Sequence, residues 1–125
     1  MGKHVQRISH KGKEIVLLDG VGLSEDEGVA AWDEMNRELR KERRDSLVLI
    51  NASSVSMTTA TVNKAKEAAT IIKDIPDCRV VFVGLTGLQK STAQLVAKSQ
   101  RLNAHFCATL EEGKEWLVRE GAGGR

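Results

Sequence analysis

Two patterns of apolar and polar positions alternate along the chain. Continuous apolar runs at residues 14–19, 46–50, 79–83 and 104–107 are typical of buried β-strands, and residues 4–9 form a further short strand in this interpretation. Between these runs lie longer stretches in which apolar residues recur every three or four positions, which predicts amphipathic helices. The sequence therefore predicts the element order β-β-α-β-α-β-α-β-α.

The predicted helices have recognisable starts, ends and inward faces. Residues 24–27, 86–89 and 109–112 have the spacing of capping boxes, whereas the second helix shows no such box. We expect the first helix to reach about residue 43, and Pro76 to end the second. The side chains expected to point inward are Val29, Trp32, Met35 and Leu39 in the first helix, Val62, Ala65, Ala69, Ile72 and Ile75 in the second, Leu88, Leu95, Val96 and Leu102 in the third, and Leu110, Trp116 and Leu117 in the fourth.

The connections between the strands determine the expected topology. Crossovers of about twenty residues require parallel neighbours and right-handed connections, while continuous apolar strands indicate a sheet covered on both faces. We therefore expect an α/β fold with four parallel strands in roughly sequential order, an antiparallel N-terminal edge strand and four helices. Residues 1–120 are expected to form a single domain, followed by a flexible C-terminal tail at residues 121–125.

A hydroxyl-rich segment lies between the third strand and the second helix. Six of the eleven residues 51–61 carry a hydroxyl and none carries a charge. Such a strand-to-helix junction is the usual ligand edge of an α/β sheet, and free N–H groups there suit an anion. The residues predicted to form a ligand or partner loop at this edge are Asp19, Asn51, Ser53, Ser54, Ser56, Thr58, Thr86 and Gly87. The alternative is a loop of local Ser/Thr turns with one helix cap.

Composition and charge exclude several function classes. A formal charge of +2 and only four aromatic residues argue against a nucleic-acid partner. The candidate edge has one carboxylate and no histidine or cysteine placed to activate a nucleophile, which argues against an enzyme. No metal site or cofactor is predicted, and the distant Cys78 and Cys107 are expected to be free thiols. No apolar run has the length of a transmembrane segment, so a cytoplasmic location is expected.

Several ordered motifs resemble those of a known family. A His-Lys-Gly-Lys turn leads into an apolar strand that ends in Asp at residues 10–19, and Val-Gly-Leu-Thr-Gly-Leu-Gln-Lys follows the fourth strand at residues 83–90. Phe106 in the fifth strand and a closing Glu-Glu-x-x-x-Trp-Leu at residues 111–117 complete the set. Together these features resemble the SpoIIAA-like, or STAS/SEC14-type, group of small bacterial proteins, which is related to the STAS anti-sigma-factor antagonists.

The resemblance implies a function and a modification site. In the anti-sigma-factor antagonists the second helix opens with Asp-Ser-Ser/Thr-Gly, whose serine is phosphorylated, and Thr59 is the nearest match here. The acid before it and the glycine after it are missing, and Asn51 replaces the usual Asp at the end of the third strand. The STAS resemblance implies a non-catalytic regulatory module that binds a protein partner or a second copy of itself. The SEC14 comparison implies a small apolar ligand or lipid in a cavity under a helix.

Two further patterns leave alternatives open. Residues 84–92 are similar to a phosphate-binding loop, but their spacing does not meet the Walker requirement, so nucleotide hydrolysis is not expected. Residues 37–44 carry five basic side chains at the end of the first helix. This stretch is interpreted as a solvated last turn that complements the helix dipole, with a docking patch for an acidic partner or lipid headgroups as the alternative.

Overall fold

Strands and helices alternate along the chain in the predicted order. In this computed structural model, residues 4–52 and 58–119 are described. Within these residues the elements are β1 (Val5–His10), β2 (Lys13–Asp19), α1 (Glu25–Leu39), β3 (Leu47–Asn51), α2 (Thr59–Lys73), β4 (Arg79–Val83), α3 (Gly87–Ser99), β5 (Asn103–Cys107) and α4 (Leu110–Val118). The α/β fold class is confirmed.

The sheet has the strand order β1-β2-β3-β4-β5. β1 is antiparallel to β2, whereas the pairs β2–β3, β3–β4 and β4–β5 are parallel, as predicted. The carboxyl ends of the parallel strands lie level, because Asp19 pairs with Asn51, Asn51 with Val83, and Val83 with Cys107. This level edge brings the loops before α1, α2 and α3 to one side of the molecule.

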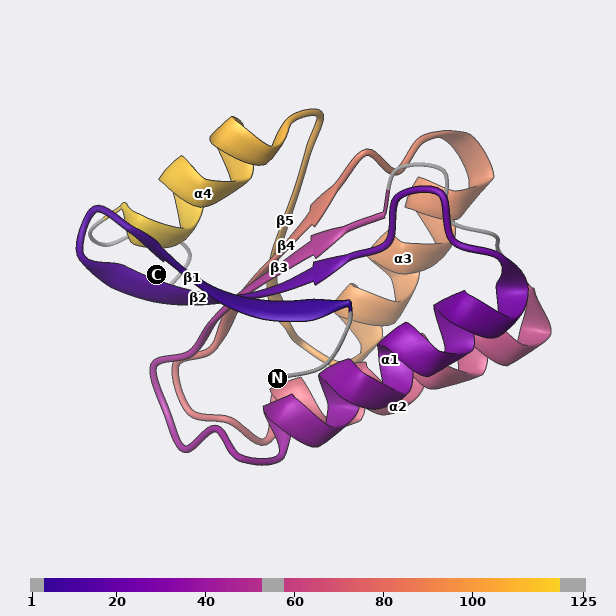
Figure 1. The fold of residues 1–125 in the computed structure, drawn as a ribbon, viewed down its shortest axis with the longest axis horizontal. Coiled ribbons are helices and arrows are strands. Elements are labelled where there is room, and N and C mark those ends of the chain that lie inside the picture. Colours follow the sequence, from indigo (N-terminus) through magenta and orange to yellow (C-terminus); the bar gives the residue numbers. More distant parts are fainter. Residues whose placement is uncertain (1–3, 53–57, 120–125) are drawn as a thin grey trace.

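The helices cover the two faces of the sheet unequally (Figure 1). Right-handed crossovers that always step to the next strand in one direction place α1, α2 and α3 on the same face. α4 follows the last strand, so it is not a crossover, and it lies on the opposite face. Trp32 and Met35 of α1 and Ile72 of α2 pack on the first face. Leu117 of α4 packs with Leu49 on the second.

The predicted end of α1 and the predicted inward face of α3 are wrong. α1 ends at Leu39, its last buried apolar residue, rather than near residue 43. Leu88 and Leu95 were expected to point inward, but 82% and 69% of their surface is exposed. Ala97, the buried residue of α3, lies nine positions after Leu88, which is half a turn away around a helix of 3.6 residues per turn. The small side chains of α3 therefore face the sheet, and its leucines face solvent.

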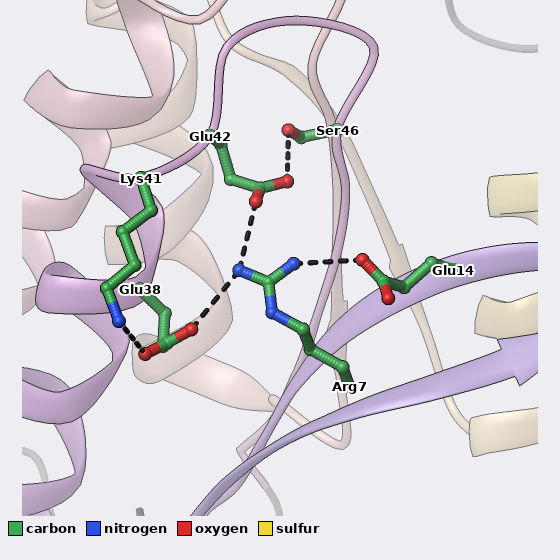
Figure 2. Close-up of polar contacts among 6 residues, drawn as sticks. All are labelled: Arg7, Glu14, Glu38, Lys41, Glu42 and Ser46. Carbon is green, nitrogen blue, oxygen red and sulfur yellow. Dashed lines mark hydrogen bonds and ion pairs between the residues drawn. The ribbon is translucent and has the colours of Figure 1, made fainter. Parts of the chain in front are cut away.

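A polar cluster around Arg7 attaches the N-terminal hairpin to the end of α1. The guanidinium of Arg7 in β1 contacts the carboxylates of Glu14, Glu38 and Glu42 at 2.9, 3.2 and 3.0 Å (Figure 2). Glu42 also accepts a 2.6 Å hydrogen bond from the Ser46 hydroxyl at the entry to β3. Arg7 therefore connects the edge strand to the end of α1 and to the turn that leads into the central sheet.

Candidate functional site

The carboxyl edge of the sheet brings two of the predicted residues together. The amide nitrogen of Asn51 donates to Oδ1 of Asp19 at 3.4 Å, and the backbone N–H of Val21 donates to the same oxygen at 3.3 Å. The carbonyl of Asn51 accepts the N–H of Gly20 at 2.9 Å. The Asp19 carboxylate is thus used to shape the turn after β2, which is a structural role.

The hydroxyl-rich segment is only partly described. Ser53, Ser54 and Ser56 lie outside the described residues. Thr58 is the N-cap of α2: its hydroxyl accepts the N–H of Thr61 at 3.2 Å, while its own N–H donates to the Thr61 hydroxyl at 3.0 Å. The second helix therefore does have a capping box, contrary to the sequence-based expectation. A Thr can take the place of the Glu or Gln at the third position because its hydroxyl reaches the same backbone N–H.

The predicted box at the start of α3 is not formed. Thr86 is the exposed N-cap of α3, but its side chain makes no capping hydrogen bond to the helix. Gly87 follows with φ +56°, a left-handed conformation that glycine adopts without strain. At α4, by contrast, the Thr109 hydroxyl accepts the N–H of Glu112 at 3.2 Å, so the N-cap half of this predicted box is present.

Thr59, the predicted phosphoacceptor, is the exposed first residue of α2. Its hydroxyl makes no hydrogen bond within the part of the chain that the structure describes. The first turn of α2 contains no acidic residue. A negative group at this position would therefore meet the positive end of the helix dipole without a neighbouring carboxylate on the same turn.

The histidines and cysteines have structural surroundings. His10 contacts the Glu115 carboxylate at 2.7 Å, and the His105 ring stacks on Trp116 with their centroids 5.0 Å apart. Both cysteines are free thiols, as predicted, and burial followed by the nearby Glu42 carboxylate raises the pKa of Cys78 to about 12.

Among residues 4–52 and 58–119, no three His, Cys, Asp or Glu side chains are grouped to hold a metal ion. No helix in these ranges is both long and apolar enough to cross a membrane.

An apolar groove lies between α2 and α3, a location that the sequence did not predict. Its floor is formed by the sheet residues Ile50 and Phe82 and its walls by the two helices, and it has a volume of about 80 Å³. Alanines of both helices contribute to the walls, namely Ala65, Ala68, Ala69, Ala93 and Ala97. Because these side chains are short, they do not fill the space between the helices. The sequence signal for the groove was this excess of alanine on two facing helices.

Leu88 and Leu95 lie next to the groove, on the outer face of α3. They are seven residues apart, so they share one side of the helix at a spacing of about 10 Å. Thr92, which lines the groove, is four residues after Leu88 and three before Leu95, so it adjoins both on the helix surface. We define the groove face as the apolar groove together with Leu88 and Leu95.

A second, polar hollow lies at the amino ends of the parallel strands, opposite the carboxyl edge of the sheet. Charged side chains of both signs line it, among them Glu42, Asp45 and Arg79. One guanidinium nitrogen of Arg79 donates to the carbonyls of Leu117 and Arg119 at 2.9 and 2.8 Å, at the end of α4. Glu42, Asp45 and Arg79 thus already have protein partners, whereas the apolar side chains of Leu88 and Leu95 are exposed.

Comparison with protein-family models and with curated protein sequences found no match to this chain.

Proposed function

We propose that this chain is a non-catalytic interaction module of the cytoplasm, related to the STAS and SpoIIAA-like domains, and that it binds a protein partner through the groove face. The observation that carries the proposal is the exposure of Leu88 and Leu95 beside an apolar groove. Exposed apolar surface that adjoins a hollow is characteristic of binding sites, and burying both leucines would stabilise a complex by about 1.5–3 kcal/mol each.

The chemistry of the remaining surface supports a non-catalytic role. Catalysis by a general base requires a base within hydrogen-bond reach of a nucleophile or substrate. Asp19 accepts hydrogen bonds from Asn51 and from a backbone N–H, and the His10 ring contacts Glu115. Each of these groups serves the local structure. Thr59 is a candidate for regulation of the module, since its hydroxyl is exposed near the start of the α2 wall of the groove.

The test compares the parent with the double variant Leu88→Ser/Leu95→Ser. Tagged versions of both are used to recover proteins from the native host, and the recovered proteins are quantified by mass spectrometry. Val21→Ser is the matched control, because Val21 is half exposed but does not line the groove. We expect a partner that the parent and Val21→Ser retain and the double variant loses. Recovery of the same proteins by all three versions contradicts the proposal.

A small apolar ligand is the second candidate function, and the apolar lining of the groove is the observation that favours it. The volume of about 80 Å³ is smaller than the ~150 Å³ of a protein cavity that takes up benzene. A lipid chain would therefore require α2 and α3 to separate. Native mass spectrometry of the purified protein tests this candidate, because a bound ligand adds its mass to the chain.

A further inference from the structure

The charged side chains of α3 are all basic. α3 contains Lys90 and Lys98 and no acidic residue, and Arg101 follows its C-terminal end. Lys98 is exposed and lies three residues after Leu95, so the two side chains are neighbours on the helix surface. Across the groove, α2 contributes Lys66. Leu95 thus has a cation beside it on α3, and a second cation lies across the groove on α2.

Lys66 is the one charged residue among the described residues that line the groove, and its ammonium group has no ion-pair partner within those residues. On the side of α2 that faces α1, by contrast, the charged side chains are paired. There Lys64 pairs with Asp33 of α1 at 2.8 Å, and Glu67 pairs with Arg40 at 2.6 Å. α2 therefore presents neutralised charges to α1 and an unneutralised cation to the groove.

The size of the groove limits what can enter it. A volume of about half that of a benzene-binding cavity suits a single aliphatic side chain better than a long acyl chain. Interfaces commonly place one apolar anchor residue in such a pocket and surround it with contacts that exclude water. The remaining apolar area, at Leu88 and Leu95, extends along two turns of α3. A partner helix laid along α3 would cover the leucines and place one side chain in the groove.

We propose that the partner segment is an acidic amphipathic helix. This second proposal rests on the proposed function, since it assigns the chemistry of the partner bound at the groove face. One apolar side chain of the segment enters the groove, its apolar stripe covers Leu88 and Leu95, and its carboxylates face Lys66 and Lys98. Attraction between these carboxylates and the lysines increases the association rate. Repulsion by the same lysines weakens the binding of basic helices that have the same apolar pattern.

The experiment is a selection of helical peptides from a random display library against the full chain, followed by affinity measurements on the selected peptides. We expect selected peptides with apolar residues at helical spacing and an excess of Asp and Glu. Lys66→Glu and Lys98→Glu should each weaken their binding about fivefold or more, and added salt should weaken it as well. Lys13→Glu is the matched control, because it makes the same charge change at an exposed position on β2.

The outcomes separate the inference from the proposed function. Peptides whose binding is lost in Leu88→Ser/Leu95→Ser, but which are neutral or basic, overturn the acidic helix and leave the groove face as the binding site. Peptides that bind the double variant as well as the parent, or a selection without any binder, overturn both. A parallel arm measures sedimentation with vesicles of phosphatidylcholine and phosphatidylglycerol. If the chain sediments with these vesicles and loses this property in Leu88→Ser/Leu95→Ser, the groove face binds an anionic membrane, and the proposal of an acidic helix as partner is overturned.

All of these substitutions are at exposed positions, so the variants should fold. Equal thermal unfolding temperatures of parent and variants establish this before binding is compared. A variant that unfolds at a clearly lower temperature is replaced by the milder Lys66→Gln or Leu95→Ala, for which the same direction of change in binding is expected.

Discussion

Gly113 of α4 packs directly against Val81 of β4, with no room for a larger residue. A Cβ atom at position 113 would lie 3.0 Å from Cγ1 of Val81 and 3.2 Å from Cγ2 of Val83. Both valines are fully buried, so neither can move away at low cost. We expect Gly113→Ala to lower the free energy of unfolding by about 1–2 kcal/mol, since overpacking outweighs the gain in helix propensity. Urea denaturation measures this change.

Gly28 of α1 provides the matched control for this prediction. A Cβ atom at position 28 would lie 3.4 Å from Cγ2 of Thr61, which is an ordinary van der Waals distance. Gly28→Ala should therefore raise the free energy of unfolding by about 0.5–1 kcal/mol through helix propensity alone. Equal effects of the two substitutions would show that α4 does not lie as close to the sheet as the structure places it.

The Arg7 cluster is expected to contribute substantially to stability. Only 22% of the Arg7 side chain is exposed, and its removal leaves the carboxylates of Glu38 and Glu42 without their shared cation. Arg7→Met should lower the free energy of unfolding by about 1–3 kcal/mol. Arg44→Met is the control, because 69% of this side chain is exposed and its ion pair with Asp45 is at the surface. Its effect should stay within about 0.5 kcal/mol.

The same cluster makes stability depend on pH in the acidic range. The hydrogen bond from Lys41 holds the pKa of Glu38 below its ordinary value of 4.5, and the bond from Arg7 adds to this against partial burial. Because the folded-state pKa is depressed, the stabilisation is fully present above the unfolded-state pKa and is lost as the pH falls through the folded one. Glu38→Gln should therefore lose less stability than the parent between about pH 6 and about pH 3. Parallel stability curves for the two proteins would count against this assignment.

The two thiols should differ in reactivity. Burial raises the pKa of Cys78 to about 12, so almost no thiolate is present near neutral pH. Burial, followed by the Glu112 carboxylate, also raises the pKa of Cys107, but this residue on the edge strand is only half buried. Iodoacetamide should modify Cys107 in the folded protein and Cys78 only after unfolding, as mass spectrometry of timed samples will show. Simultaneous modification of both would contradict the burial of Cys78.

The elements that the sequence predicted correctly are those in which pattern and packing agree. Continuous apolar strands such as residues 47–50 become the central strands, where both faces of the sheet are covered. The Ser24–Glu27 capping box is formed because both partners belong to one turn of helix. In these cases the controlling interactions are local, or depend only on whether a side chain is apolar.

The groove face could not be predicted because it depends on which side of α3 meets the sheet. Leu88, Leu95 and Ala97 are all apolar, so periodicity alone allows either the leucines or the alanine to face inward. The alanine side is the one buried, and the small side chains leave the groove between α2 and α3. Likewise, the Thr58–Thr61 box was missed because a hydroxyl takes the place of the usual carboxylate or amide.

The start of α2 offers a test that separates capping from binding. Thr58→Ala removes the hydroxyl that accepts the Thr61 N–H, so it should lower the free energy of unfolding by about 1 kcal/mol. Thr59→Ala removes an exposed hydroxyl and should leave stability unchanged. Thr59→Glu adds a negative charge to a first helical turn that has none, so it should raise stability by about 0.3–1 kcal/mol.

Binding then decides whether Thr59 has a regulatory role. If phosphorylation of Thr59 controls the module, Thr59→Glu should change recovery of the partner while the fold stays intact, because the added charge alters the surface and not the core. Thr59→Ala should behave like the unmodified parent, except that it takes up no phosphate from a host kinase extract. Partner recovery is measured for both variants beside Thr58→Ala, which controls for loss of the cap. If both Thr59 variants bind as the parent does, the exposed hydroxyl has no part in recognition and the threonines at this end of α2 serve only to start the helix.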